Sequence, residues 1–346
     1  MWQTGIAWAE RGWIPDLVLR AGIRLLVRQR LSEEAAHDPE LSAEREHSFF
    51  QKMSAAPIAL VPEKANEQHY EVPAEFFQLV LGPNRKYSCC YWDERSTDLA
   101  KAEENALRIT CERAGLRDGM RVLDLGCGWG SLSLWIARHY PRCEVRAVTN
   151  SQRQAEFLSR ELAQNGIGNV QVYRADMNDF NAGEKFDRIV SVEMFEHMRN
   201  WPLLFQRIHS WLFPDGQLFL HIFTHRSVAY EYVPRSVADW MSRYFFTGGM
   251  MPSDCLPVLC SQEHWRLVRR WRWGGHQYER TCRAWLRRMD DHRSQILPIL
   301  AATYGTSHAA VWWHRWRIFF LACAEMFGFR GGREYGVGHY LFSPRS

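Results

Sequence analysis

The segment from Arg121 to Gly130 constrains the fold of this chain more than any other. It spells RVLDLGCGWG, an apolar run that ends in three closely spaced glycines and leads into a helical pattern. This order predicts a strand, a glycine-rich turn and a helix. Glycines let the backbone approach a ligand, and the first turn of a helix presents unpaired N–H groups. We therefore expect a nucleotide-like cofactor to bind at this turn.

The glycine spacing argues against a dinucleotide. A dinucleotide fingerprint has the pattern GxGxxG and an acidic residue about 20 positions later that binds the ribose. Here Gly130 comes one residue early, and the next predicted strand ends at Thr149 and Asn150 instead of an acid. The pattern DxGxGxG, placed between a strand and a helix, resembles the first motif of class I S-adenosylmethionine (SAM) methyltransferases.

Apolar runs and helical patterns alternate regularly from about residue 119 to residue 223. The predicted strands cover residues 121–125, 144–149, 170–175, 186–192 and 217–223. This alternation predicts a Rossmann-like α/β fold, a mostly parallel sheet that binds ligands at the C-terminal ends of its strands. Residues 224 to about 335 are mostly helical and rich in tryptophan, with strands near 265–273 and at 336–342. We expect this part to form a helical cap that supplies the acceptor pocket.

We divide the chain into an N-terminal helical extension, residues 1–60, and a methyltransferase domain, residues 61–346, with its core at about 100–223 and its cap at about 224–335. Apolar residues recur at helical spacing in the extension and predict a face that docks on the rest of the protein: Ile14, Leu17, Val18, Ala21 and Leu25. Beside it lies a stripe of arginines that we expect to be solvated, Arg20, Arg24 and Arg28. The alternative is a helix on a membrane surface. An exposed extension could also pair two copies in a homodimer.

Composition narrows the possible partners and location. The net charge is +4, and no basic run with interleaved aromatic residues suggests nucleic acid. The nine cysteines form no CxxC pair or zinc-ligand spacing, so we expect no metal and a reducing, cytoplasmic location. The longest apolar stretch, residues 318–329, contains Glu325 and is too short to cross a bilayer. The 16 tryptophans fit either a core or a pocket for an aromatic or lipid substrate.

Polar residues at two strand ends are candidates for binding the cofactor. Asp176, just after the third strand, could accept a hydrogen bond from an adenine amino group while Met177 packs on the ring. The alternative is an aspartate that only forms a turn. Thr149, Asn150 and Gln154 could contact the ribose in place of the missing acid.

Two carboxylates and an imidazole follow the fourth strand: Glu193, Glu196 and His197. Methyl transfer from SAM is an in-line displacement, so the enzyme must orient the nucleophile and remove any proton that masks it. An alkylamine is mostly protonated at neutral pH and needs such a base. Acids also cap helices without catalysing anything. His221, within an apolar strand, is either a core histidine or a functional one.

Longer strings resemble a family, the cyclopropane-fatty-acid-synthase-type SAM methyltransferases, and especially the coclaurine N-methyltransferases. The resemblance runs nearly end to end. The strings that carry it are RGWIPD at 11–16, YSC at 87–89, the glycine motif, EMFEHM at 193–198, DWM at 239–241, YFFTGG at 244–249, MPS at 251–253 and WLxRMD at 285–290. The resemblance implies SAM-dependent methylation of an amine on a small, aromatic, tetrahydroisoquinoline-like acceptor.

The resemblance also assigns residues. SAM would be held by Tyr87, Ser88, Gly126, Gly128, Thr149, Asn150, Gln154, Asp176 and Met177. The acceptor amine would be bound and deprotonated by Glu193, Glu196 and His197, with Glu71 as a further pocket carboxylate. Aromatic side chains that would surround the acceptor are Trp240, Phe245, Phe246 and Tyr278.

Two alternatives stay open. Cyclopropane synthases use a bicarbonate base, and the resemblance assigns its site to Cys89, Glu196, His221 and Tyr278; Gln277, between His276 and Tyr278, departs from the usual His-Tyr pair. That alternative predicts a lipid acceptor and contact with a membrane surface. The second alternative is a SAM-binding module without catalysis, which would leave the acid and imidazole cluster unexplained.

Overall fold

A seven-stranded sheet forms the centre of the molecule. The computed structural model describes residues 2–60, 72–234, 239–261 and 263–345. Parallel strands are β1 (Arg121–Leu125), β2 (Glu144–Thr149), β3 (Val170–Arg174), β4 (Phe186–Val192) and β5 (Leu212–His225). Two antiparallel pairs, β5 with β9 (Tyr335–Pro344) and β9 with β8 (Trp265–Gly274), complete the order β3-β2-β1-β4-β5-β9-β8. The predicted mostly parallel α/β sheet is confirmed.

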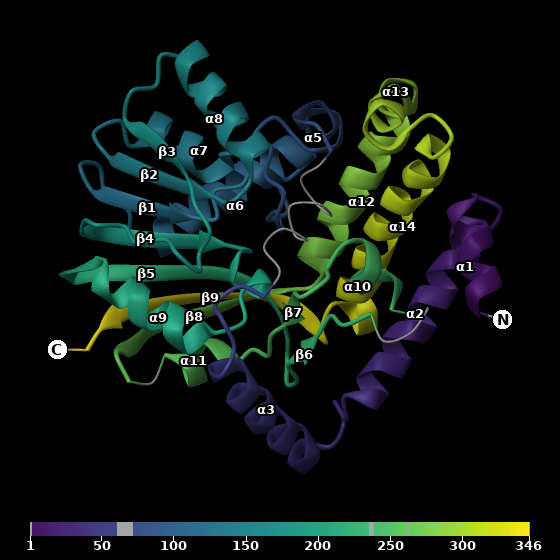
Figure 1. Cartoon of the computed structure of the whole chain (residues 1–346), viewed down its shortest axis with the longest axis horizontal. Coiled ribbons are helices and arrows are strands. Elements are labelled where there is room, and N and C mark those ends of the chain that lie inside the picture. The colour runs from purple at the N-terminus through teal and green to yellow at the C-terminus, as the bar shows by residue number, and fades with distance from the viewer. Residues whose placement is uncertain (1, 61–71, 235–238, 262, 346) are drawn as a thin grey trace.

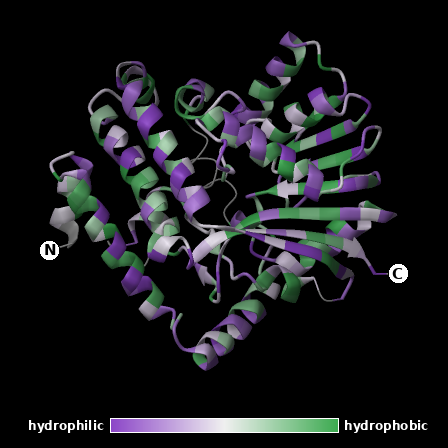
Figure 2. Cartoon of the chain, turned by 180° about the vertical axis from the view of Figure 1, so that it is seen from behind, coloured by the Kyte–Doolittle hydropathy of each residue, from purple (hydrophilic) through white to green (hydrophobic). Residues whose placement is uncertain are grey.

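Helices cover both faces of the sheet. One face carries α6 (Leu99–Arg113), α7 (Ser131–His139) and α8 (Gln152–Gln164), and the other α3 (Pro39–Ser54), α9 (Trp201–Ser210) and α11 (Leu256–Cys260). Successive side chains of a strand point to opposite faces, so Val122 packs with the first group and Leu123 with the second. Figure 2 shows the resulting apolar stretches on the strands and the mixed, amphipathic colouring of the helices.

The remaining helices lie beside the sheet (Figure 1). They are α1 (Trp2–Glu10), α2 (Asp16–Glu33), α5 (Ala74–Val80), α10 (Trp240–Tyr244), α12 (His276–Asp291), α13 (Arg293–Tyr304) and α14 (Ala309–Phe327). Short elements are β6 (Tyr230–Glu231), which pairs with β7 (Met250–Met251), and the 3-10 turns η2 (Phe195–His197) and η3 (Phe329–Gly331). Helices α2, α12 and α14 pack together in an apolar cluster rich in aromatic rings. The predicted helical extension and helical cap segments are thus helical.

The orientation predicted for α2 is wrong. Leu17 and Leu25, expected to dock, are 81% and 54% exposed. Arg20 and Arg24, expected to be solvated, pair with the buried carboxylate of Glu325 on α14, although the Arg24 side chain stays 54% exposed. Arg28 is exposed, as predicted. Helical spacing shows which residues share a face but not which face turns inward. Here the buried carboxylate requires a cationic partner, and this requirement turns the arginines toward the cap.

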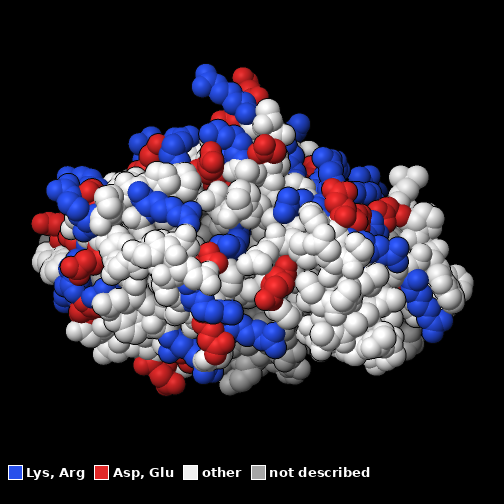
Figure 3. All heavy atoms as spheres, turned by 90° about the horizontal axis from the view of Figure 1, so that it is seen from above, with Lys and Arg blue, Asp and Glu red and all other residues white. Residues whose placement is uncertain are grey.

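The described residues contain no helix that is long and apolar enough to cross a membrane. On the face seen from above, basic and acidic side chains intermingle (Figure 3).

Candidate active site

The glycine turn after β1 has the strand–turn–helix geometry that the sequence predicts. Gly126, Gly128 and Gly130 have positive φ angles of 82°, 54° and 82°, and α7 begins at the next residue. A Cβ at Gly126 would lie 2.6 Å from Cβ of Met194, and one at Gly130 would lie 2.3 Å from a methyl carbon of Leu158. These two positions therefore exclude a side chain both by conformation and by space. At Gly128, nothing within 4 Å would meet a Cβ, so the turn leaves room above it.

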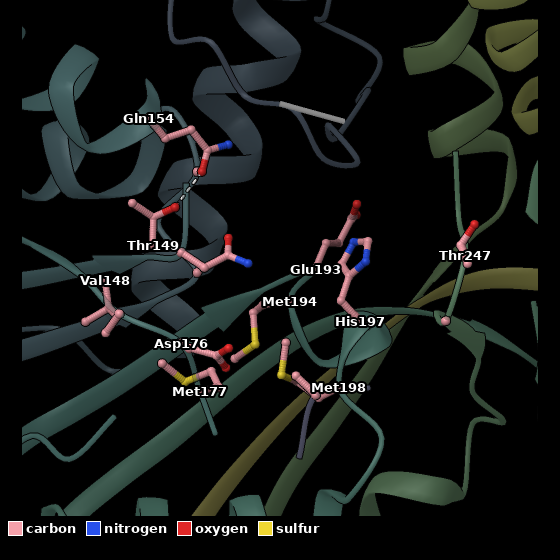
Figure 4. Close-up of a pocket in the computed structure, with 16 residues that line it drawn as sticks. Val148, Thr149, Gln154, Asp176, Met177, Glu193, Met194, His197, Met198 and Thr247 are labelled. Atoms are coloured by element: carbon pink, nitrogen blue, oxygen red, sulfur yellow. Dashed lines mark hydrogen bonds between the residues drawn. The ribbon is translucent and has the colours of Figure 1, made fainter. Parts of the chain in front are cut away.

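Most of the predicted cofactor residues line one pocket at the C-terminal ends of β1, β2, β3 and β4. They are Gly126, Gly128, Thr149, Asn150, Gln154, Asp176 and Met177. Figure 4 shows Thr149, Gln154 and Asp176 on one side, and Glu193 beside His197 on the other. An adjoining pocket is lined by Tyr87 and Ser88 and shares Gly126, Gly128, Gln154 and Glu193 with the first. The structure thus brings all nine predicted cofactor residues together.

The residues of this pocket fit SAM. Gln154 Oε1 accepts a 2.6 Å hydrogen bond from Thr149 Oγ1, while the buried Gln154 Nε2 has no hydrogen-bond partner in the described residues. Ser131 Oγ, at the start of α7, is likewise buried without a partner there. Asp176 uses Oδ1 to accept the Asn178 N–H at 2.8 Å, so it forms a turn and also lines the pocket. Unused polar groups around a glycine turn suit a ligand with both an amino-acid and a nucleoside part.

Glu193 lies where the two pockets meet, and three groups hold its carboxylate. Oε1 accepts the Cys89 N–H at 2.9 Å and lies 3.2 Å from His221 Nε2, and Oε2 accepts the Tyr278 hydroxyl at 2.6 Å. Its own φ is 50°, an uncommon value for a residue with a side chain. The pKa of Glu193 is raised above its usual value, because the effect of burial exceeds the opposing effects of Lys86, the Cys89 N–H and the Tyr278 hydroxyl. The surroundings therefore favour an anion at a site that burial disfavours.

Glu196 and His197 follow on η2 in different environments. His197 lines the first pocket and its ring stacks on Phe246, with centroids 4.9 Å apart. Burial lowers the pKa of His197 to about 4, so its imidazole is neutral at pH 7. Glu196 is fully buried; Oε1 accepts the Phe223 N–H at 2.7 Å, and Oε2 has no hydrogen-bond partner in the described residues. Burial and the neighbouring Glu193 raise the pKa of Glu196 well above its usual value.

Three residues of the set that the resemblance assigns to bicarbonate meet at a different glutamate. Cys89, His221 and Tyr278 do converge, but on the carboxylate of Glu193 and not on that of Glu196. The backbone of Cys89, not its thiol, makes this contact, and burial raises the pKa of the thiol well above its usual value. Sequence order gave no means to tell which of two glutamates three residues apart would face these groups.

The predicted acceptor residues are only partly brought to the pocket. Phe246 and Tyr278 adjoin it through His197 and Glu193. Phe245 is fully buried and stacks on Phe319, and Trp240 donates to Glu10 and lines a separate cavity of about 630 Å³ between α1, α2 and the cap. Glu71 lies outside the described residues.

Other residues of the site carried no assigned role in the sequence. Lys86, buried beside Glu193, donates to Ser88 Oγ and to the Cys89 carbonyl at 2.8 Å. Asp124, the acid of the glycine motif, lines the second pocket and accepts the Ser133 hydroxyl at 2.6 Å. Its place in the DxGxGxG pattern was a signal for it. Lys86 had no such signal, because an isolated lysine is normally exposed.

Comparison with known proteins agrees with this geometry. A family model described as mycolic acid cyclopropane synthetase matches residues 61–332. The (S)-coclaurine N-methyltransferase of Thalictrum flavum subsp. glaucum is 36% identical over 97% of this chain and 94% of its own length. Cyclopropane-fatty-acyl-phospholipid synthase of Escherichia coli strain K12 is 32% identical over 64% of this chain and 55% of its own length.

Solved structures give the same relationship. The crystal structure of a coclaurine N-methyltransferase bound to N-methylheliamine and S-adenosylhomocysteine (SAH) superposes with a TM-score of 0.93 at 35% identity, covering 97% of this chain and 98% of that one. The cyclopropane synthase MmaA2 of Mycobacterium tuberculosis has a TM-score of 0.69 at 25% identity over 82% of this chain and 99% of that one. This chain belongs to the mycolic acid cyclopropane synthetase family and is a SAM-dependent methyltransferase.

Proposed function

We propose that this enzyme transfers the methyl group of SAM to the nitrogen of a small aromatic amine, such as a tetrahydroisoquinoline alkaloid. The observation that carries the proposal is the carboxylate of Glu193, fixed by the Cys89 N–H, His221 and Tyr278 next to the SAM pocket. An alkylamine arrives mostly as a cation, and a fixed anion attracts and orients it. The similarity to N-methyltransferases of plant alkaloids supports this substrate class.

The proton that masks the nitrogen lone pair must leave before transfer. We assign its removal to His197 and Glu196 together. His197 lines the pocket, and its neutral imidazole has a lone pair that can accept a proton. Burial and Glu193 raise the pKa of Glu196 well above its usual value, so Glu196 holds a proton firmly once it has received one. SAM supplies an electrophilic methyl group on sulfonium; the nitrogen forms a bond to this carbon as the carbon–sulfur bond breaks.

Phe246 is the aromatic side chain best placed to contact the rings of the acceptor. It stacks on His197 and also lies against Tyr232, with centroids 5.1 Å apart. A second ring flanked by these side chains would be desolvated, which lowers the pKa of an amine and assists the base. Trp240 and Phe245 lie further from the SAM pocket and would act indirectly, by supporting the cap.

The alternative of lipid cyclopropanation meets a physical obstacle. Three groups assigned to bicarbonate already hold the Glu193 carboxylate. A bicarbonate ion at the same groups would have to share them with Glu193, and two ionised acids in one buried site are costly. The carboxylate of Glu193 thus competes with this base.

The test follows the label from methyl-labelled SAM. Purified enzyme is incubated with a panel of amines that includes tetrahydroisoquinolines and, separately, with unsaturated phospholipid vesicles. We expect label on an amine nitrogen. Label in acyl chains, lost when bicarbonate is removed, would overturn the proposal in favour of cyclopropanation.

We also propose that the enzyme works in the cytoplasm. All nine cysteines are free thiols, and most are buried, as expected for a reducing compartment. Finding the tagged enzyme in a cytoplasmic fraction would support this location, and secretion with disulfides formed would contradict it.

A further inference from the structure

A row of hydrogen bonds leads from Glu193, through two buried histidines, to Arg113 at the end of α6. Glu193 Oε1 lies 3.2 Å from His221 Nε2, and His221 Nδ1 lies 2.9 Å from Nε2 of His339. Nδ1 of His339 in turn lies 2.8 Å from Nη1 of Arg113, at the end of α6. The two histidines are cross-strand partners on β5 and β9, so their side chains lie on the same face of the sheet.

The chemistry of these groups fixes the direction of every hydrogen bond. A guanidinium has no acceptor, so Arg113 must donate and His339 Nδ1 must accept. A neutral imidazole has one N–H, so His339 Nε2 carries it and donates to His221 Nδ1. Because His221 Nδ1 accepts this hydrogen bond, the single N–H of the neutral His221 ring is at Nε2, and it donates to Glu193. A second proton on either ring would place two donors face to face.

The packing around the row holds both rings in the neutral form. His221 and His339 are fully buried. Trp273 lies against both rings, with centroid distances of 5.4 and 4.3 Å. Burial and the charges of Arg113 and Lys86 lower the pKa of each ring well below its usual value. Arg113 itself lies over Trp271 and Trp273, and forms no ion pair with a described carboxylate. The charged and titratable groups that act on it at longer range are Tyr91, Arg269 and Glu112.

We propose that Arg113 and His339 are positioning residues, which act through His221 to hold Glu193 as an oriented anion for the acceptor amine. Glu193 and Arg113 are then the two ends of an extended ion pair, joined by two neutral rings. Each hydrogen bond polarises the next, so the charge of Arg113 is felt at the carboxylate without direct contact. The amine-binding role of Glu193 rests on the proposed N-methylation, whereas the row of hydrogen bonds does not.

Other charged or titratable groups also surround Glu193 and influence its pKa. They are Lys86, Cys89 and Cys90 from the segment before α6, Glu196 and His197 from η2, and Tyr278 and Cys282 from α12. The variants below leave all of these unchanged. A change in the behaviour of Glu193 in those variants therefore belongs to the row itself.

The kinetic test compares pH profiles of kcat/KM for an amine that the enzyme methylates. Without the charge of Arg113, Glu193 binds its proton more tightly, so the variant Arg113→Met should lose about tenfold in kcat/KM on the acidic limb. That limb should move by about one pH unit toward higher pH, and activity should recover in alkaline buffer. Arg113→Lys, which keeps the charge, should retain most of the activity.

Arg269→Met is the matched control. Arg269 is exposed and lies over the same Trp271 ring at 5.1 Å, but it is not part of the row. Its profile should equal that of the unmodified enzyme. A loss in Arg113→Met that is equal at all pH values would indicate a structural role only and overturn the proposal, as would an unchanged profile.

A second measurement needs no acceptor at all. In histidine-labelled enzyme with SAH added, nitrogen NMR should show N–H at Nε2 and none at Nδ1 for both rings, assigned with His339→Leu and His221→Gln. In Arg113→Met, the pattern at His339 should change. An Nδ1–H on either ring in the unmodified enzyme would refute the row. If the NMR pattern holds but no amine is methylated, the proposed function fails and the row stands.

Discussion

The hydroxyl of Tyr278, on α12 of the cap, lies 2.6 Å from Oε2 of Glu193, which follows β4 of the sheet. A hydrogen bond thus connects the cap to the acid that we assign to amine binding. Burial and Glu193 raise the pKa of this tyrosine well above its usual value, so the hydroxyl keeps its proton and donates.

Tyr278→Phe should therefore weaken amine binding. The variant removes one hydrogen bond to a charged acceptor, typically worth about 1.5–3 kcal/mol, so KM for the amine should rise by roughly 10- to 100-fold. Steady-state kinetics measure this effect, and calorimetry should show SAM affinity within about twofold of the original. An equal loss of SAM affinity would mean that Tyr278 supports the whole pocket.

Glu196→Gln should affect turnover and spare the cofactor. The amide keeps an acceptor for the Phe223 N–H but cannot take a proton. Loss of a general base costs about 10²- to 10⁴-fold, so kcat should fall in that range while SAM binding stays nearly unchanged. Single-turnover assays with labelled SAM report the chemical step. Full activity in this variant would remove Glu196 from the proton path.

Asp124→Asn tests the electrostatics of the cofactor turn. Burial raises the pKa of Asp124 to about 6, although the Ser133 hydroxyl acts to lower it. The folded pKa exceeds the usual value of about 3.9, so the stability that this group contributes is complete below about pH 4 and is lost as pH rises through about 6. The neutral amide avoids this loss. Relative to the original protein, the variant should gain on the order of 3 kcal/mol between pH 4 and pH 8.

Chemical denaturation of both proteins across this pH range measures the difference in the free energy of unfolding. Ser133→Ala serves as the companion, because it removes the hydroxyl and leaves the acid. A difference between Asp124→Asn and the original protein that does not depend on pH would contradict the raised pKa.

We expect Arg20 and Arg24 of α2 to stabilise the folded protein. Replacing Arg20 and Arg24 by Met leaves the carboxylate of Glu325 buried without a cation, which should destabilise the protein by about 3 kcal/mol in urea unfolding. Arg28→Met is the control, because Arg28 belongs to the same stripe but is exposed. Its cost should stay within about 0.5 kcal/mol. Equal effects of the two changes would mean that the ion pairs do not hold α2.

The sequence predicts the sheet well because its signals are local. The bounds of β1, β2 and β4 agree residue for residue, since each is a short apolar run closed by turn residues. The orientation of α2 could not be predicted, because it depends on Glu325, some 300 residues away. The division into extension, core and cap stays a prediction.

The cofactor pocket was also accessible from the sequence, because the ends of parallel strands meet at one edge. The arrangement of the proposed catalytic residues was harder to predict from the sequence. Glu193 and Glu196 are similar in the sequence, but it is Glu193, with its positive φ, whose carboxylate contacts Tyr278 and His221. His339 and Arg113 had no motif at all. Pairing of β5 with β9 brings His339 to His221, and the end of α6 brings Arg113 to His339.

The contact between Gly126 and Met194 has a mechanical consequence. Cβ and Cγ of Met194 fill the space that a side chain at Gly126 would need, so the glycine turn packs closely against the residue that follows Glu193. Interiors packed at this density transmit displacement instead of absorbing it. A side chain at Gly126 would therefore have to displace Met194, and with it the backbone next to Glu193. Packing alone thus ties the geometry of the cofactor turn to that of the acid that we assign to amine binding.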